Sequence, residues 1–128
     1  MINHYEASAL VDSQGVKHEI IEVCEYYDFN IGNVIKYVAR APYHKDGKVK
    51  NWQKAIYYLK RENAFDHLNY ACIRPYGDKL SRFYLVLGLA RAQNNIFNTL
   101  IDEDGLIDSY SIDCAIELLN REIQNENE

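Results

Sequence analysis

The sequence predicts an all-α protein, a compact bundle of about five helices in a single domain. Three observations support this fold class. Apolar residues recur at spacings of three and four along most of the chain, which is typical of helices that bury one face. Only two prolines occur, Pro42 and Pro75, and both fall where this periodicity is interrupted. The length of 128 residues, with 48% hydrophobic residues, suits one domain with its own core.

The first two expected helices precede Pro42. One spans about 16–27, with apolar residues on one face and glutamates mostly on the others. The next spans about 30–41, where Asn30 is the expected N-cap. This helix ends before Pro42, because the residue before a proline disfavours helical angles. A short strand at 9–14 is an alternative for the segment ahead of both helices and is not part of the predicted fold.

Three further helices are expected, over about 49–70, 78–100 and 111–124. The middle one contains the almost wholly apolar run at 84–90, which is typical of a central buried helix. Ser111 is expected to cap the last helix. The expected apolar faces are Ile31, Val34, Ile35 and Val38 in the second helix, Trp52, Ala55, Ile56 and Leu59 in the third, and Ile112, Ala115, Ile116, Leu119 and Ile123 in the last.

A block of positive charge at 36–61 is the feature that bears most on function. It contains eight basic residues and one acidic residue, a net charge of +7, whereas the whole chain carries −5. A basic patch on an acidic body fits one anionic ligand of limited size, such as a nucleotide or another small phosphorylated molecule. Long nucleic acid is a poor match, because the domains that bind it are usually basic overall.

Within this block, the helix at 30–41 is the expected binding site. Lys36 and Arg40 are four residues apart and therefore point the same way, with Asn33 one turn earlier. A phosphate group needs several convergent donors of these kinds. Gly32 in the first turn is expected to let an anion approach free backbone N–H groups. On charge pattern alone, an ordinary solvated helix face stays open as the alternative.

Several other kinds of site are disfavoured. The loop at 43–48 contains Gly47-Lys48 but is no P-loop, since Pro42 stands where the first glycine belongs, and no G-x-G-x-x-G occurs. Zinc is not expected, because the chain has no C-x-x-C pair and no helical histidine pair. No apolar run is long enough to span a bilayer, and the N-terminus does not resemble a signal peptide. A cytoplasmic protein without membrane contact is therefore expected.

Acidic residues recur at every third position near the first helix, as Glu19, Glu22, Glu25 and Asp28. Carboxylates at i and i+3 of a helix can hold a hard cation such as magnesium, although a solvated acidic face is the simpler interpretation. Glu19 and Glu22 also suit an all-α nucleotide pyrophosphohydrolase, whose second acidic pair would have to be Glu62 and Asp66. We assign no metal ligand, and a requirement for magnesium stays open.

The region from His4 to about Glu62 resembles a known family. Its pattern is His-Tyr near the start, Gly-Asn-x-x-Lys-Tyr-x-x-Arg, a lysine-bearing loop and Lys-Ala-x-x-Tyr-Leu. The matching residues are His4-Tyr5, Gly32-Asn33, Lys36-Tyr37, Arg40, Lys45, Lys54-Ala55 and Tyr58-Leu59. In order, identity and spacing they resemble the SaV-like phage family, a domain of unknown function that includes a nucleoside-monophosphate kinase without a P-loop.

The resemblance implies a nucleotide-binding role, with a kinase as the leading hypothesis. Such an enzyme would transfer a phosphoryl group from ATP or a deoxynucleoside triphosphate to a deoxynucleoside monophosphate. The expected catalytic residues are then Lys36 and Arg40 for the phosphates and Glu22 for a metal or a proton. The expected substrate-binding residues are His4, Tyr5, Asn33, Tyr37, Lys45, Lys54 and Tyr58.

Two alternatives use the same region differently. A non-enzymatic protein could sequester a nucleotide or inhibit a host defence with the same basic patch, and the pyrophosphohydrolase remains the weaker option. In each case we expect 1–62 to be the family-like region with the basic patch, and 63–128 to be a helical C-terminal half. A phage origin would imply the host cytoplasm. The identity of the nucleotide and the oligomeric state, a homo-oligomer included, stay open.

Overall fold

The computed structural model describes residues 9–11, 17–25, 27–41, 45–63, 84–86, 91–101 and 107–127. Most of these residues are helical, as the sequence predicts. The helices are α2 (Ile20–Cys24), α3 (Phe29–Arg40), α4 (Gly47–Asn63), α5 (Arg91–Leu100) and α6 (Ser109–Asn127). Because α2 has only five residues, the four longer helices make up the helical body of the described chain, rather than five comparable ones.

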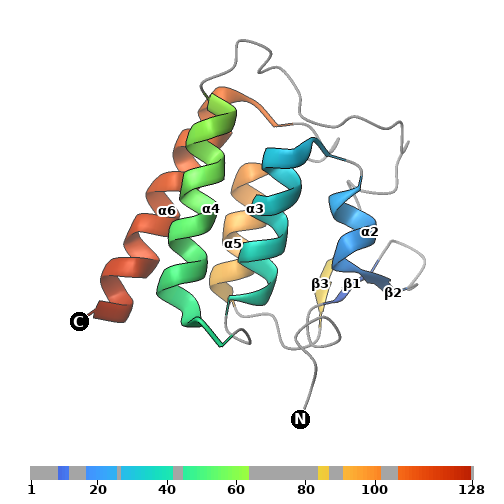
Figure 1. Ribbon diagram of the computed structural model, residues 1–128, viewed down its shortest axis with the longest axis horizontal. Helices are drawn as coiled ribbons and strands as arrows, with labels where there is room; N and C mark the ends of the chain where they lie inside the picture. The colour runs from blue at the N-terminus through green and yellow to red at the C-terminus, as the bar shows by residue number, and fades with distance from the viewer. Residues whose placement is uncertain are drawn as a thin grey trace.

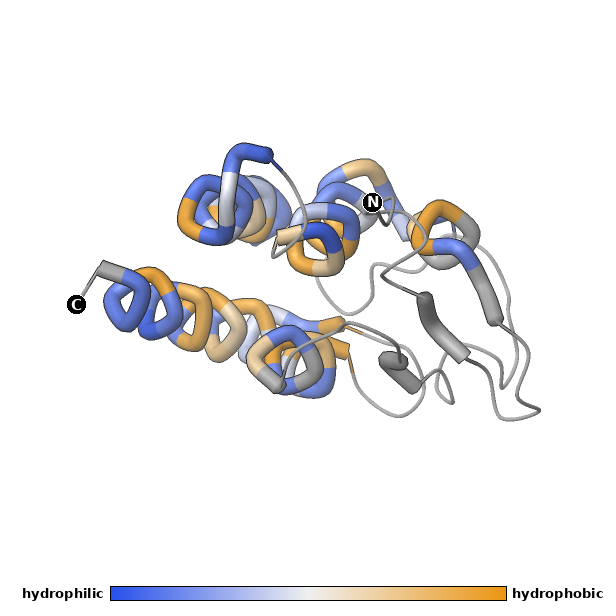
Figure 2. Tube along the Cα trace, turned by 90° about the horizontal axis from the view of Figure 1, so that it is seen from below, coloured by the Kyte–Doolittle hydropathy of each residue, from blue (hydrophilic) through white to orange (hydrophobic). Residues whose placement is uncertain are grey.

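These helices form two layers (Figures 1 and 2). Helices α2, α3 and α4 lie side by side in one layer, and α5 and α6 form the other. The core lies between the layers, where the apolar faces predicted for three of the helices are buried, apart from Ile116 and Ile123 of α6, which are half-buried against it. Its fully buried side chains include Ile31, Val34, Ile35 and Val38 of α3, Leu59 of α4, Ile96 and Leu100 of α5, and Ile112 and Leu119 of α6.

A small sheet departs from the all-α prediction. Strand β1 (Ala9–Val11) pairs antiparallel with β2 (Lys17–Glu19) on one side and β3 (Tyr84–Val86) on the other. A strand therefore forms at Ala9–Val11, within the segment 9–14, for which the predicted fold has no strand. The helix predicted over 78–100 is wrong at Tyr84–Val86, which is a strand, and is confirmed at Arg91–Leu100, which is α5. The rest of the predicted helix lies outside the described residues. A short apolar run fits a buried strand as well as a buried helix, and periodicity alone does not separate the two.

The first predicted helix is also shorter than expected. Residues 17–19 belong to β2, so the helix is confined to Ile20–Cys24. Helix α4 begins at Gly47, two residues before the predicted start, and is described as far as Asn63. The predicted continuation to residue 70 lies outside the described residues. None of the helices in the described part of the chain is long and apolar enough to cross a membrane.

Both predicted N-caps are corrected in the same way, because an aspartate precedes each helix. Asp28, rather than Asn30, caps α3: its Oδ1 accepts a hydrogen bond from the backbone N–H of Ile31 at 2.9 Å. Asp108, rather than Ser111, precedes α6 and accepts from the Ser111 N–H at 2.7 Å. Ser111 Oγ in turn accepts from the Asp108 N–H at 3.1 Å, the reciprocal arrangement of a capping box.

Candidate functional site

The basic residues predicted to bind phosphate meet on one face of the α3–α4 pair. Lys36 Nζ lies 4.5 Å from the centre of the Tyr37 ring, and Arg40 Cζ lies 4.6 Å from it. Lys54 of α4 places its Nζ 5.3 Å from the same ring centre. The two cations expected from the i, i+4 spacing are thus joined by a third from the neighbouring helix. We call Lys36, Arg40 and Lys54 the cation cluster.

Aromatic side chains hold this cluster together. Tyr37 stacks on Tyr58 of α4, with ring centres 5.8 Å apart and ring planes 11° apart. The negative face of an aromatic ring attracts cations, with about 0.5–1 kcal/mol for an exposed contact, which offsets part of the repulsion among three positive side chains. Asp46 pairs with one member of the cluster, with its Oδ2 3.4 Å from Lys54 Nζ. The face therefore keeps an excess of positive charge.

Arg40 is held by a buried neutral side chain. Its Nε donates to Asn51 Oδ1 at 3.1 Å, and Asn51 is fully buried. Asn51 Nδ2 in turn donates to the backbone carbonyl of Gly47 at 2.7 Å. Gly47 begins α4 with φ of 84°, a conformation that favours glycine. Because Asn51 carries no charge, it orients the guanidinium group and leaves its positive charge available to a ligand.

The C-terminal end of α3 is also fixed from the second layer. Gln93 of α5 is buried, and its Nε2 donates to the backbone carbonyls of Val38 and Ala39, both at 2.9 Å. The last carbonyls of a helix have no partner within the helix, so this side chain satisfies two of them. The backbone that carries Arg40 is therefore positioned from both α4 and α5.

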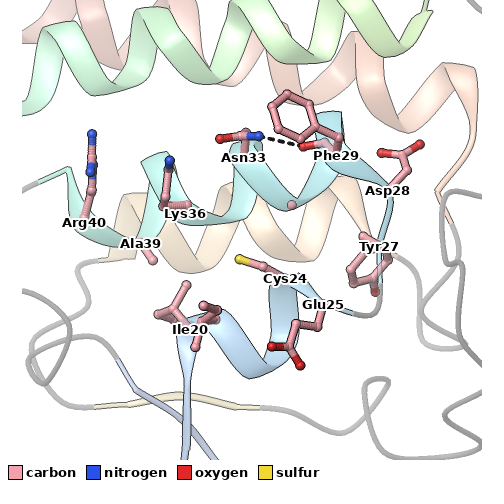
Figure 3. A pocket seen from close by; sticks show the side chains of 12 residues that line it. Ile20, Cys24, Glu25, Tyr27, Asp28, Phe29, Asn33, Lys36, Ala39 and Arg40 are labelled. Atoms are coloured by element: carbon pink, nitrogen blue, oxygen red, sulfur yellow. Dashed lines mark hydrogen bonds between the residues drawn. The ribbon is translucent and has the colours of Figure 1, made fainter.

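A hollow of about 350 Å³ lies between α2 and α3, beside the cation cluster. Asn33, Lys36 and Arg40 follow one another along α3, and Ile20 and Cys24 of α2 lie across from them (Figure 3). Asn33 Nδ2 donates to the backbone carbonyl one turn earlier, at 2.8 Å. The hollow thus combines apolar surface with two of the three clustered cations.

Cys24 contributes apolar surface to this hollow rather than a reactive group. Burial raises the pKa of its thiol to about 12, although the nearby Lys36 charge acts in the opposite direction. A thiol with so high a pKa is protonated at neutral pH and is a poor nucleophile.

Gly32 has a different role from the expected one. A Cβ at this position would lie 3.2 Å from the backbone oxygen of Cys24, so the glycine allows α2 and α3 to approach closely. Its N–H already donates to the backbone carbonyl of Asp28 at 2.8 Å. The Asp28 side chain caps the same helix end. The prediction that Gly32 opens the helix N-terminus to an anion is therefore wrong.

The other predicted site residues are less well defined. Lys45 is exposed in the turn before α4, and no described contact joins it to the cation cluster. Glu22 lies in α2, but its side chain is outside the described residues. His4 and Tyr5 are also outside them. Of the ten predicted residues, the structure brings together Asn33, Lys36, Tyr37, Arg40, Lys54 and Tyr58.

The acidic series near the first helix does not form one helix face. Glu19 ends β2, Glu25 follows α2, and Asp28 precedes α3. Glu19 and Glu22 therefore do not lie within the same helix. The Glu22 side chain and Asp66 lie outside the described residues, so the pyrophosphohydrolase alternative stays a prediction. Within the described residues, no group of three or more side chains could hold a metal ion.

Sequence reasoning missed the two buried amides that position the site, Asn51 and Gln93. A signal for both is present in the sequence. Asn51 is four residues before buried Ala55, and Gln93 is three residues before buried Ile96, so each lies in an apolar stripe. A polar side chain at such a position is expected to find a buried hydrogen-bond partner.

The comparisons with known proteins bear on the first half of the chain. A family model described as a protein of unknown function (DUF3310) matches residues 3–60, a little under half of the sequence. This segment includes α2, α3 and most of α4, and hence the whole cation cluster. The match supports a domain of unknown function there. Comparisons with curated proteins and with solved structures gave no match.

Proposed function

We propose that this protein binds a nucleotide, or a closely related small phosphorylated molecule, at the cation cluster and the adjoining hollow. One observation carries the proposal: Lys36 and Arg40 belong to the cation cluster and also line the hollow. Phosphate donors and apolar surface are therefore continuous. Arginine and lysine are the side chains best suited to phosphate oxygens, and a neutral partner such as Asn51 leaves Arg40 its charge.

The size of the site supports a small ligand. A hollow of about 350 Å³ is within the range of small-molecule sites, at its lower end. The positive charge is local, since the chain as a whole carries −5. An acidic body repels long polyanions but leaves a short anion free to reach the cluster.

Within this proposal, the leading activity is a nucleoside-monophosphate kinase that lacks a P-loop. The support is the resemblance of the first half to the SaV-like phage family, together with the convergence of three cations. Phosphoryl transfer depends mainly on positioning and on stabilising the charge of the transferring group. Lys36 and Arg40 would hold that group, and Arg40 would stabilise its charge in the transition state.

A protein that sequesters a nucleotide without turnover is the second candidate. The volume of the hollow favours it, because about 350 Å³ suits one ligand better than a donor and an acceptor together. An assay separates the two. The protein is incubated with ATP and each deoxynucleoside monophosphate, with and without magnesium, and new diphosphates are measured. A kinase forms at least one diphosphate and loses this activity in Arg40→Ala; tight binding without any diphosphate indicates sequestration.

Binding itself is tested by thermal unfolding with a panel of nucleotides. A ligand present at 100 times its Kd stabilises the folded protein by about 2.7 kcal/mol. We expect at least one nucleotide to do so, and expect Lys36→Ala and Arg40→Ala to lose the effect. Lys48→Ala is the matched control, since Lys48 is a basic residue of α4 outside the cation cluster and pairs with Glu126 of α6 at 3.3 Å. Normal stabilisation of both site variants would refute the proposed site.

A further inference from the structure

A group of aromatic side chains lies next to the cation cluster. Phe29 is 75% exposed and Tyr57 is 57% exposed. Both meet Tyr58 edge to face, with ring centres 6.0 Å and 5.2 Å away and ring planes at 75° and 86°. We call Phe29, Tyr57 and Tyr58 the aromatic platform. It joins the first residue of α3 to the middle of α4.

The exposure of these rings calls for an explanation. A single exposed aromatic side chain is ordinary, but rings from two helices gathered around a third make a contiguous apolar surface, which is typical of binding sites. Phenylalanine gains much from burial and offers water no hydrogen-bonding group. Phe29 nevertheless leaves three quarters of its surface exposed while its ring contacts Tyr58. Such a ring is available to stack on a flat partner.

The platform is continuous with the cation cluster. Tyr58 stacks on Tyr37, and Tyr37 is the ring around which the three cations gather. Along α3 the distance is set by helix geometry. Phe29 precedes Lys36 by seven residues and Arg40 by eleven, which at 1.5 Å per residue is roughly 10 Å and 16 Å. Phe29 and Arg40 thus lie at opposite ends of α3, with Lys36 between them.

We infer that the aromatic platform binds the base of a nucleotide whose phosphate chain runs along α3 toward Arg40. This inference rests on the proposed function and names its ligand class, a nucleoside di- or triphosphate. In a monophosphate only the sugar separates the base from the phosphate. A monophosphate is therefore too short to place its base on Phe29 and its phosphate at Arg40. Stacking on an aromatic ring contributes about 1–3 kcal/mol of binding free energy per base, whichever base it is. We therefore expect the platform to require that the ligand has a base but not to distinguish one base from another.

The test compares ligands with and without a base. The four deoxynucleoside triphosphates, their monophosphates and inorganic tripolyphosphate are titrated by calorimetry into the wild type and into Phe29→Ala/Tyr57→Ala. We expect the double variant to lose about tenfold or more in affinity for the triphosphates. Its affinity for tripolyphosphate is expected to stay within about twofold, since stacking on a ring requires a base. Wild-type protein is expected to prefer triphosphates to monophosphates.

Three further variants keep the comparison interpretable. Tyr110→Ala removes a ring that is 77% exposed at the start of α6 and outside the platform, and it is expected to bind all ligands normally. Phe29→Leu/Tyr57→Leu keeps apolar side chains but removes the rings, and it replaces the alanine variant if that variant unfolds. Arg40→Ala is expected to lose affinity for triphosphates and tripolyphosphate alike.

The outcomes separate this inference from the proposed function. If Arg40→Ala weakens triphosphate binding but the ring variants do not, the platform is refuted and the proposed function stands. The platform is also refuted if the ring variants lose as much affinity for tripolyphosphate as for the triphosphates. The rings would then affect binding by positioning the cation cluster and not by contacting a base. Monophosphates that bind as tightly as triphosphates overturn the ligand class. If the wild type binds neither nucleotides nor tripolyphosphate, the proposed function itself fails.

Discussion

Arg40 is the residue at which the parts of the site meet. Its guanidinium lies 4.6 Å from the Tyr37 ring centre, its Nε donates to Asn51, and it lines the hollow. The spacing of Lys36 and Arg40 made both residues predictable from the sequence. The sequence places Asn51 in an apolar stripe, but its hydrogen bond to Arg40 depends on the pairing of α3 with α4, which no local pattern reveals.

Asn51 offers a direct test of how Arg40 is used. Asn51→Asp keeps an acceptor for Arg40 Nε but adds a negative charge beside the guanidinium, so the affinity for a phosphorylated ligand is expected to fall about tenfold or more. Asn51→Ala removes both hydrogen bonds of a buried side chain and is expected to cost about 1–3 kcal/mol of stability. Denaturant unfolding and ligand titration of both variants measure these effects. Unchanged affinity in Asn51→Asp would mean that the charge of Arg40 does not contact the ligand.

Glu62 predicts a pH dependence of stability. It is 1% exposed, and Asn30 Nδ2 donates to its Oε1 at 3.4 Å. Burial, and then the hydrogen bond and charge of the nearby Asp28 carboxyl group, raise the pKa of Glu62 from its ordinary value of 4.5 to about 8. Between these pH values the folded chain keeps a proton that the unfolded chain has released. The contribution of Glu62 to stability is therefore present below about pH 4.5 and is lost as the pH rises to about 8.

Glu62→Gln removes this titration because the amide stays neutral. We expect the variant to melt about 5 °C above the wild type at pH 8.5 and close to it at pH 4.5, as a change of 1 kcal/mol shifts Tm by a few degrees. Thermal unfolding of both proteins across this pH range measures the difference. A Tm difference that is the same at every pH would show that Glu62 does not keep its proton in the folded state.

At the scale of elements, long amphipathic helices were predictable and short elements were not. α3, α4 and α6 each carry an apolar stripe that repeats over several turns, and these stripes are buried. The short apolar run at Tyr84–Val86 fits a strand or a helix equally, and β1 selects the strand through pairing with residues about 75 positions away. The caps were misplaced by a few residues because Asp28 and Asn30 are both good N-cap residues.

The contact between α2 and α3 depends on Gly32. We expect Gly32→Ala to lower Tm although alanine favours helices by about 1 kcal/mol, because its Cβ would lie 3.2 Å from the Cys24 carbonyl oxygen. Asn98→Ala, at an exposed position of α5, is the matched control and is expected to raise Tm slightly. Thermal unfolding measures both. An increase in Tm for Gly32→Ala would mean that α2 moves away from α3 at little cost.

At the scale of the molecule, the second half of the chain completes a site that lies in the first. The family match covers residues 3–60, which include the cation cluster, but α3 and α4 pack on α5 and α6. Gln93 of α5 fixes the end of α3, and Asn63 of α4 donates from Nδ2 to Asp113 Oδ1 of α6 at 2.8 Å. The concentration of positive charge at 36–61 was predictable from the sequence, because it follows from counting the charged residues there. The support from the second layer was not, since it depends on tertiary packing.

The location of ligand binding is the central claim, and nuclear magnetic resonance tests it most directly. Deoxynucleoside triphosphates are titrated into uniformly ¹⁵N-labelled protein, and amide shift changes are followed for the wild type and Arg40→Ala. We predict that the largest changes lie at 33–40 in α3 and 51–58 in α4, the stretches that carry the cation cluster, and that Arg40→Ala loses most of them. Changes confined to α5 and α6, or equal changes in Arg40→Ala, would contradict the account.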